Sequence, residues 1–174
     1  LSQIVAQLQL LNYEVMNSHN GSIKVNPHLS NLDNCLAAVE ECDLFLGIIR
    51  PYYGTGNIDG TNITFAEIKK AIELKKPYWF LVHRDVVFAR LLFDKMKLSD
   101  GAKIEIEPNK FFDQRTIAIY DYVIQNHVEV KLRNGNWAQE FYRLDEMMTY
   151  IITQFSDLDF VEKILNEKPT KDGQ

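Results

Sequence analysis

The stretch from Asp43 to Val82 limits the possible folds of this chain most strongly. Its residues follow the order of a strand, a glycine-containing loop, a helix and a second strand. Leu44–Ile49 and Tyr78–Val82 are unbroken apolar runs of strand length, which is typical of parallel strands covered on both faces. Between them, Thr64–Lys75 has apolar residues on one helical face and charged residues on the other. The stretch therefore predicts one strand–helix–strand unit of a parallel sheet.

The loop Arg50–Ile63 leaves the carboxyl end of the first predicted strand, the end at which open α/β sheets bind ligands. It is long for such a connection and contains Gly54, Gly56 and Gly60, so its backbone can turn tightly and approach a ligand closely. Glu67 follows in the expected first turn of the helix. We expect its carboxylate to face a solvent-filled crevice at the edge of the sheet.

The rest of the chain alternates in the same way and predicts an open, mainly parallel, flavodoxin-like α/β sheet with helices on both faces. We expect one domain over residues 1–166 and a mobile tail over residues 167–174. In a flavodoxin-like order the central strand would precede the first helix, so we expect either residues upstream of Leu1 or a different order. Helices are predicted over Ser2–Leu11, Ser30–Glu41, Asp85–Met96, Gln114–Gln125, Asp145–Phe155 and Phe160–Asn166. Extended segments are predicted at Tyr13–Asn17, at Lys103–Glu107 and in a C-terminal hairpin that pairs Val128–Leu132 with Trp137–Phe141 across Asn134-Gly135.

Composition excludes several classes of protein. The hydrophobic content of 46% suits a globular domain, and no apolar run is long enough to cross a bilayer. The net charge of −5 argues against a broad nucleic-acid surface. Cys35 and Cys42 lie too far apart on one predicted helix to form a disulfide, and they indicate reduced thiols in a cytoplasmic protein. No metal-ligand spacing is present, so we predict neither a metal site nor a bound cofactor.

The segments NCLAAVEECDLFLGIIRPYYGTG and DGTNITFAEIKKAIELKKPYWFLVHRDV resemble a bacterial TIR-like family of unknown function. That family also occurs at the N-terminus of signalling NTPases of the NACHT type. The likeness continues through DQRTIAIYDYVIQ and NWAQEFYRLDEMMTYIITQF. More distantly, the Asp-Gly-Thr sequence with a helical glutamate and Lys-Lys-Pro is similar to nucleoside 2-deoxyribosyltransferases. The resemblance implies a role in signalling or bacterial defence.

In active TIR domains a glutamate supports cleavage of the nicotinamide–ribose bond of NAD, and the matching residue here is Glu67. A carboxylate beside the anomeric carbon can stabilise an oxocarbenium-like state or attack it. Thr64 and Glu67 also have the spacing of a capping box, in which Glu67 would bond back to the Thr64 N–H. Both interpretations stay open. A helix N-terminus would favour the ionised form of the carboxyl group.

Other residues of the predicted crevice have ligand-binding chemistry. Arg50 can meet a phosphate, Tyr53 can stack on a base, and Gly54 allows close approach of the backbone. Asp59 and Thr61 can bind ribose hydroxyls, although Asp-Gly-Thr is also a common turn sequence. His83 ends the second strand and either moves a proton or has a structural hydrogen bond.

Two functions from different classes follow from these patterns. The first is an enzyme that binds a small nucleotide such as NAD and cleaves its N-glycosidic bond through Glu67. The second is a non-catalytic signalling module that presents a surface for protein interaction or homo-oligomer formation. A nucleotide sensor without catalysis is a narrower form of the first. Because folds of this class host many activities, the choice depends on the site itself.

Overall fold

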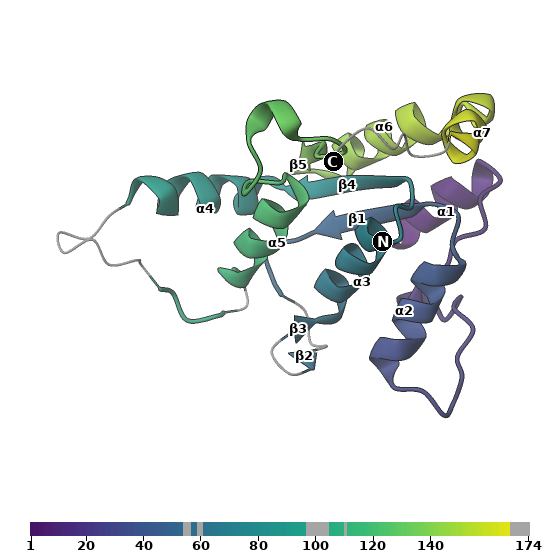
Figure 1. The fold of residues 1–174 in the computed structure, drawn as a ribbon, viewed down its shortest axis with the longest axis horizontal. Helices are drawn as coiled ribbons and strands as arrows, with labels where there is room; N and C mark the ends of the chain where they lie inside the picture. Colours follow the sequence, from purple (N-terminus) through teal and green to yellow (C-terminus); the bar gives the residue numbers. More distant parts are fainter. Residues whose placement is uncertain (54–56, 59–60, 97–104, 110, 168–174) are drawn as a thin grey trace. The chain divides into compact units, whose positions relative to one another are not determined.

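The fold is an α/β arrangement around a three-stranded open parallel sheet, shown as a ribbon in Figure 1. The computed structural model describes residues 1–53, 57–58, 61–96, 105–109 and 111–167. The strand order is β1-β4-β5, and Phe80–His83 of β4 pairs with Ala138–Phe141 of β5 in parallel register. This architecture confirms the predicted fold class and is consistent with a flavodoxin-like fold.

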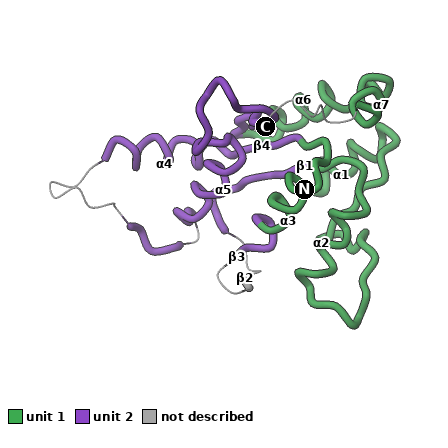
Figure 2. Tube along the Cα trace, viewed as in Figure 1, with its two compact units in different colours: residues 1–45, 66–78, 143–174 green, residues 46–65, 79–142 purple. Residues whose placement is uncertain are grey.

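Contacts within the chain divide it into two compact units, coloured separately in Figure 2. Unit 1 comprises Leu1–Phe45, Ala66–Tyr78 and Arg143–Gln174, and unit 2 comprises Leu46–Phe65 and Trp79–Tyr142. Helix α3 (Ile63–Glu73) begins in unit 2 and continues into unit 1.

Unit 1 is built mainly from helices. Helix α1 contacts α6, and α6 contacts α7. The ring of Tyr13 meets the edge of the Phe155 ring, and its hydroxyl donates to the Phe155 carbonyl over 3.1 Å. The helices that lie wholly in this unit are α1 (Ser2–Leu10), the 3-10 turn η1 (Ser18–Asn20), α2 (Asn31–Glu41), α6 (Leu144–Phe155) and α7 (Leu158–Asn166). Its buried apolar residues are Ile4, Val5, Leu8, Cys35, Val39, Ile68, Ala71, Met147, Ile151, Phe155 and Val161.

Ser30, where the predicted helix begins, caps α2. Ser30 accepts the Asp33 N–H at 3.0 Å, and its hydroxyl donates to the Asp33 carboxylate at 2.7 Å. Behind this cap, the buried Asn34 side chain bonds to the backbone of Asn26 through both its amide nitrogen and its oxygen. The loop before α2 is thereby tied to the helix, as a buried amide requires.

Unit 2 holds almost all of the sheet. The connection after β1 contains a small antiparallel pair in which Ile58 faces Thr61. Helix α4 contacts both α5 and β5. The elements of this unit are β1 (Phe45–Ile49), β2 (Asn57–Ile58), β3 (Thr61–Asn62), β4 (Tyr78–His83), α4 (Arg84–Lys95), α5 (Arg115–Val123), the 3-10 turn η2 (Val130–Leu132) and β5 (Ala138–Phe141). Its buried apolar residues are Ile49, Tyr53, Phe80, Leu81, Val82, Val86, Ala89, Ile119, Val123 and Phe141.

Three local predictions are wrong. The C-terminal hairpin does not form: Val130–Leu132 is a 3-10 turn, and Ala138–Phe141 joins the parallel sheet beside β4. Residues 13–17 have no regular structure, and the polar cluster after them forms η1. Of the edge strand predicted at Lys103–Glu107, residues 105–107 are not extended in a sheet, and the other two lie outside the described residues.

Candidate functional site

Helix α3 begins earlier than the sequence predicts, and this changes the position of Glu67 within the helix. The helix begins at Ile63, and the Asn62 side chain accepts the Phe65 N–H at 3.2 Å. Asn62 therefore caps the helix in place of Thr64, because the capping residue is the one whose side chain accepts a bond from the third helical N–H. Glu67 consequently lies in the second turn, and the predicted capping box between Thr64 and Glu67 is wrong.

The Glu67 carboxyl group is partly buried, and the Cys35 side chain of α2 lies near it. Burial raises the pKa of Glu67 from 4.5 to about 7, and the nearby Cys35 thiol partly opposes this rise. The helix-terminus effect that we expected to favour the ionised form fades beyond the first turn. Desolvation instead controls the charge of this group.

A small pocket lies in unit 2 beyond the end of β1. Its volume of about 50 Å³ is well below the roughly 300 Å³ of a typical small-molecule site, so it can hold only a fragment of a nucleotide. The last residues of β1, the segment after it, the start of α3 and one face of α5 line it. The lining residues are Ile48, Ile49, Arg50, Tyr52, Tyr53, Asn62, Thr64, Thr116 and Ile119.

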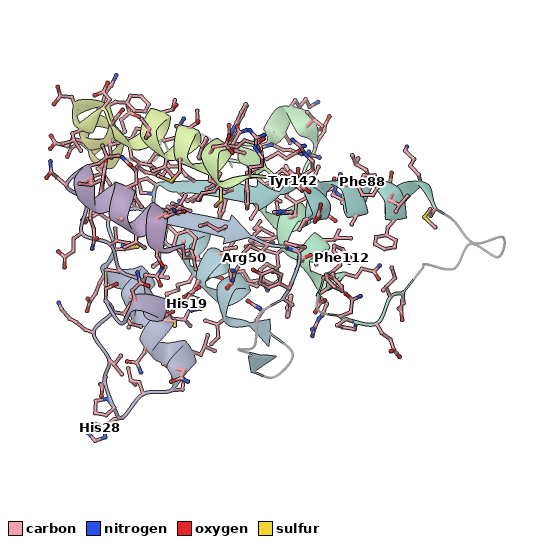
Figure 3. The ribbon with its side chains drawn as sticks, turned by 180° about the vertical axis from the view of Figure 1, so that it is seen from behind. His19, His28, Arg50, Phe88, Phe112 and Tyr142 are labelled. Atoms are coloured by element: carbon pink, nitrogen blue, oxygen red, sulfur yellow. The ribbon has the colours of Figure 1, made fainter. Side chains whose placement is uncertain are left out.

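Arg50, the first residue after β1, is labelled in Figure 3. Its Nη1 donates to the Tyr52 hydroxyl at 2.8 Å, and its guanidinium lies 4.5 Å from the centre of the Tyr52 ring. No ion pair among the described residues includes Arg50. The guanidinium therefore keeps donors that suit a phosphate, and binding of a phosphate there stays a prediction.

Tyr53 is only 8% exposed, and the Arg115 guanidinium lies 4.2 Å from the centre of its ring. Arg115 in turn makes a two-pronged ion pair with Asp113, whose side chain is 5% exposed, with Nη2 to Oδ2 at 2.6 Å and Nε to Oδ1 at 3.0 Å. The Arg115 bonds lower the pKa of Asp113. A guanidinium thus lies over one face of each ring, but Tyr52 is 44% exposed and therefore presents more of its ring to a base than Tyr53 does.

His83 has a structural hydrogen bond, the second of its two predicted roles. Its Nδ1 accepts the Asp85 N–H at 3.2 Å and so caps helix α4. The Phe141 ring meets it edge-on at 5.2 Å between centres, and Tyr142 lies beside it. His83 ends β4 at the same edge of the sheet as Arg50, but it is not one of the residues that line the pocket.

The structure says little about the remaining predicted site residues, Gly54, Asp59 and Thr61. Gly54 and Asp59 lie outside the described residues, and Thr61 is described only by its pairing in β3. Within unit 2 the structure brings Arg50 and Tyr53 together at one pocket, and Glu67 belongs to unit 1.

Sequence reasoning missed three residues at or beside the pocket of unit 2. It assigned no role in the site to Asp113, Arg115 or Thr116. The one available signal was Asp113 two residues before Arg115 at a helix start, where the Asp113 carboxylate accepts the Arg115 N–H at 3.0 Å. The described residues contain no group of three His, Cys, Asp or Glu side chains that could hold a metal ion. None of the helices within the described ranges is both long and apolar enough for a membrane span.

The fold and this edge of the sheet define a domain of the open, parallel α/β class. A family model, Domain of unknown function (DUF4062), matches residues 2–134, and the chain belongs to that family. Searches of curated proteins and of solved structures find no match. This match confirms the predicted membership of an uncharacterised domain family, and the family description assigns no activity.

Proposed function

We propose that this protein is a TIR-like signalling or defence domain that cleaves the N-glycosidic bond of NAD or a related nucleotide, with Glu67 as its catalytic carboxyl group. The environment of Glu67 carries the proposal. Its carboxyl group is partly buried, and burial raises its pKa to about 7. None of the ion pairs among the described residues involves it. Carboxyl groups shifted by desolvation in this way are typical of functional sites.

Cleavage of the N-glycosidic bond requires mainly a carboxylate held beside the ribose C1′ atom. When the bond between ribose C1′ and the nicotinamide nitrogen breaks, the electron pair leaves with nicotinamide, which departs as a neutral ring. Positive charge then develops on C1′ and the ring oxygen. An ionised Glu67 stabilises that charge or attacks C1′, and water completes the hydrolysis at the same carbon. Because the pKa lies near 7, the ionised form is well populated at neutral pH.

Two residues of unit 2 have side chains that suit a nucleotide. Arg50 offers guanidinium donors to a phosphate, and the exposed Tyr52 ring offers a stacking surface to a base.

Nicotinamide release from NAD tests the proposal directly. Wild-type protein and Glu67→Gln are incubated with NAD, and the products are separated by chromatography. We expect the wild type to release nicotinamide and Glu67→Gln to be at least ~100-fold slower, since a placed carboxyl group contributes about that factor. The wild-type rate should rise with pH through about 7, as Glu67 ionises.

The matched control is Glu73→Gln, which changes an exposed glutamate of the same helix and should leave the rate unaltered. Equal rates for wild type and Glu67→Gln would refute the role of Glu67. A wild type that releases no base from NAD or from nucleosides would instead support the second candidate function.

That second candidate is a non-catalytic module for protein interaction or homo-oligomer formation. Its supporting observation is the surface of helix α4 and the residue after it, where large apolar side chains are exposed. Phe88, labelled in Figure 3, is 63% exposed, and Leu91, Leu92 and Met96 are exposed as well. Exposed apolar side chains grouped on one helix are typical of interaction surfaces.

A further inference from the structure

Helix α4 buries one face in unit 2 and leaves the other exposed. Val86 and Ala89 are buried on the inner face, and the helix contacts α5 and β5. On the outer face Phe88 is 63% exposed (Figure 3), and Leu92 is exposed as well. A helix that is apolar on its solvent face too is typical of one that a further element covers.

The outer face of α4 has the spacing of a coiled-coil seam. Four exposed residues recur at intervals of three, four and three, as the a and d positions of a heptad pattern do; they are Asp85, Phe88, Leu92 and Lys95. Because a and d residues pack against a neighbouring helix, this spacing indicates a helix as the occupant of the face.

The charges at the two ends of this seam favour a second copy of α4 that runs in the opposite direction. In an antiparallel pair each a residue faces a d residue, so Phe88 meets Leu92 of the second copy. At both ends of the pair, Asp85 of one copy meets Lys95 of the other. A parallel pair would instead set Asp85 against Asp85 and Lys95 against Lys95. The antiparallel orientation also places the positive N-terminus of each helix beside the negative C-terminus of the other.

Both charged side chains are available for such a pair. The side chains of Asp85 and Lys95 are 57% and 82% exposed, and their ion pairs within the chain are long: 3.5 Å to His83 and 3.8 Å to Asp94. Exposed ion pairs contribute little to stability. They can therefore be exchanged for a pair with the second copy at small cost.

We propose that this chain forms a symmetric homodimer through an antiparallel pair of α4 helices. Phe88 packs on Leu92 of the second copy, and Asp85 pairs with Lys95 of the second copy. The proposal gives the exposed surface of α4 one occupant, a second copy of this chain. It goes beyond the proposed function, because neither Glu67 nor NAD takes part in the contact.

The same register extends the contact beyond the seam. Met96, the exposed residue after α4, reaches the first turn of the other α4. There the exposed ring of Tyr142, labelled in Figure 3, has its centre 5.4 Å from the Arg84 guanidinium. A thioether against an aromatic ring is a favourable contact, so each end of the pair gains an apolar addition.

Sedimentation velocity of the whole chain over a range of concentrations tests the dimer. We expect the wild type to dimerise as its concentration rises, and Phe88→Glu to raise the dissociation constant at least ~30-fold, because each copy loses a central apolar residue of the interface. The matched control is Phe111→Glu, which changes another exposed phenylalanine of unit 2, outside α4, and should leave the dissociation constant unaltered.

Charge reversal tests the antiparallel register. Lys95→Glu should raise the dissociation constant about tenfold, because it sets two carboxylates together at each end of the pair. Asp85→Lys combined with Lys95→Glu should return it to near the wild-type value. In a parallel pair Lys95→Glu would replace one like-charged contact by another and change little. An unchanged dissociation constant in Lys95→Glu would therefore overturn the register.

Two further outcomes would overturn the dimer itself. A wild type that stays monomeric up to about 1 mM has no such interface. A dimer that Phe88→Glu does not weaken has its interface elsewhere. Glu67→Gln should dimerise as the wild type does while it releases no nicotinamide, so the failure of the dimer and the failure of the proposed function are seen in separate measurements.

Discussion

Two carboxyl groups of this protein, Glu67 in unit 1 and Asp113 in unit 2, are both withdrawn from water, yet their pKa values move in opposite directions. Burial raises the pKa of Glu67 to about 7, whereas the hydrogen bonds from Arg115 lower the pKa of Asp113. The difference lies in the partner: Asp113 has a bidentate guanidinium, whereas no ion pair among the described residues involves Glu67. Burial alone therefore does not mark a functional carboxyl group. A desolvated one without a cation remains free to change its charge near neutral pH.

The largest expected effect is on stability through Glu67. Since its pKa is higher in the folded state, ionising it opposes folding: the penalty is absent below about pH 4.5, develops up to about pH 7 and is complete above it. We expect Glu67→Gln to raise the free energy of unfolding at pH 8 by roughly 3 kcal/mol and to change it little at pH 4.5. Urea unfolding at the two pH values measures the difference. The same gain at both would show that Glu67 is not desolvated.

A smaller effect of opposite sign is expected for the second carboxyl group. Asp113→Asn should lower the free energy of unfolding by roughly 2 kcal/mol at pH 7, because Arg115 loses its charged acceptor. The folded-state pKa of Asp113 is lowered, so this contribution is complete above about pH 4 and is lost as the pH falls further.

Asp145→Asn provides the control for Asp113→Asn. Asp145 also makes a two-pronged pair with an arginine, Arg143, but the Asp145 side chain is 64% exposed. Little change in stability is expected there. Equal losses in the two variants would mean that burial does not strengthen the Asp113 pair.

The smallest effect concerns how the helix that carries Glu67 begins. Asn62→Ala should destabilise the protein by about 1 kcal/mol, since it removes the acceptor of the Phe65 N–H. Thr64→Ala should change stability by a few tenths of that amount. Thermal unfolding of the two variants measures this ranking. The reverse order would restore Thr64 as the cap and return Glu67 to a capping role.

Much of the framework is local and was therefore predictable. Unbroken apolar runs predict strands β1 and β4, and apolar residues at helical spacing predict helices α3 and α6. Ser30 is a typical capping residue and marks the start of α2. The position of β5 was not predictable in the same way. Asn134-Gly135 is a strong local signal for a hairpin turn. Ala138–Phe141 instead pairs with β4, a strand far away in the sequence, and a local pattern cannot predict such a pairing.

The candidate site was predictable only in part, for the same reason. The type and place of Glu67 and Arg50 can be read from their positions after β1. The charge of Glu67 depends on the burial of its side chain, which the packing of the folded chain determines and no spacing rule predicts. Asn62 was passed over as a cap because a better-known pattern, Thr64 with Glu67, stands two residues later.

Lys76, at the turn after α3, links the ends of helices α2 and α3. Its ammonium donates to the carbonyls of Glu40 and Cys42 at the end of α2, at 2.7 and 2.6 Å, while Lys70 meets the Glu40 carboxylate at 2.6 Å. The two lysines fasten the helix that bears the thiol to the helix that bears the carboxyl group. Amide hydrogen exchange in α2 and α3 should therefore proceed through a shared opening, so that a local loosening of either helix exposes both.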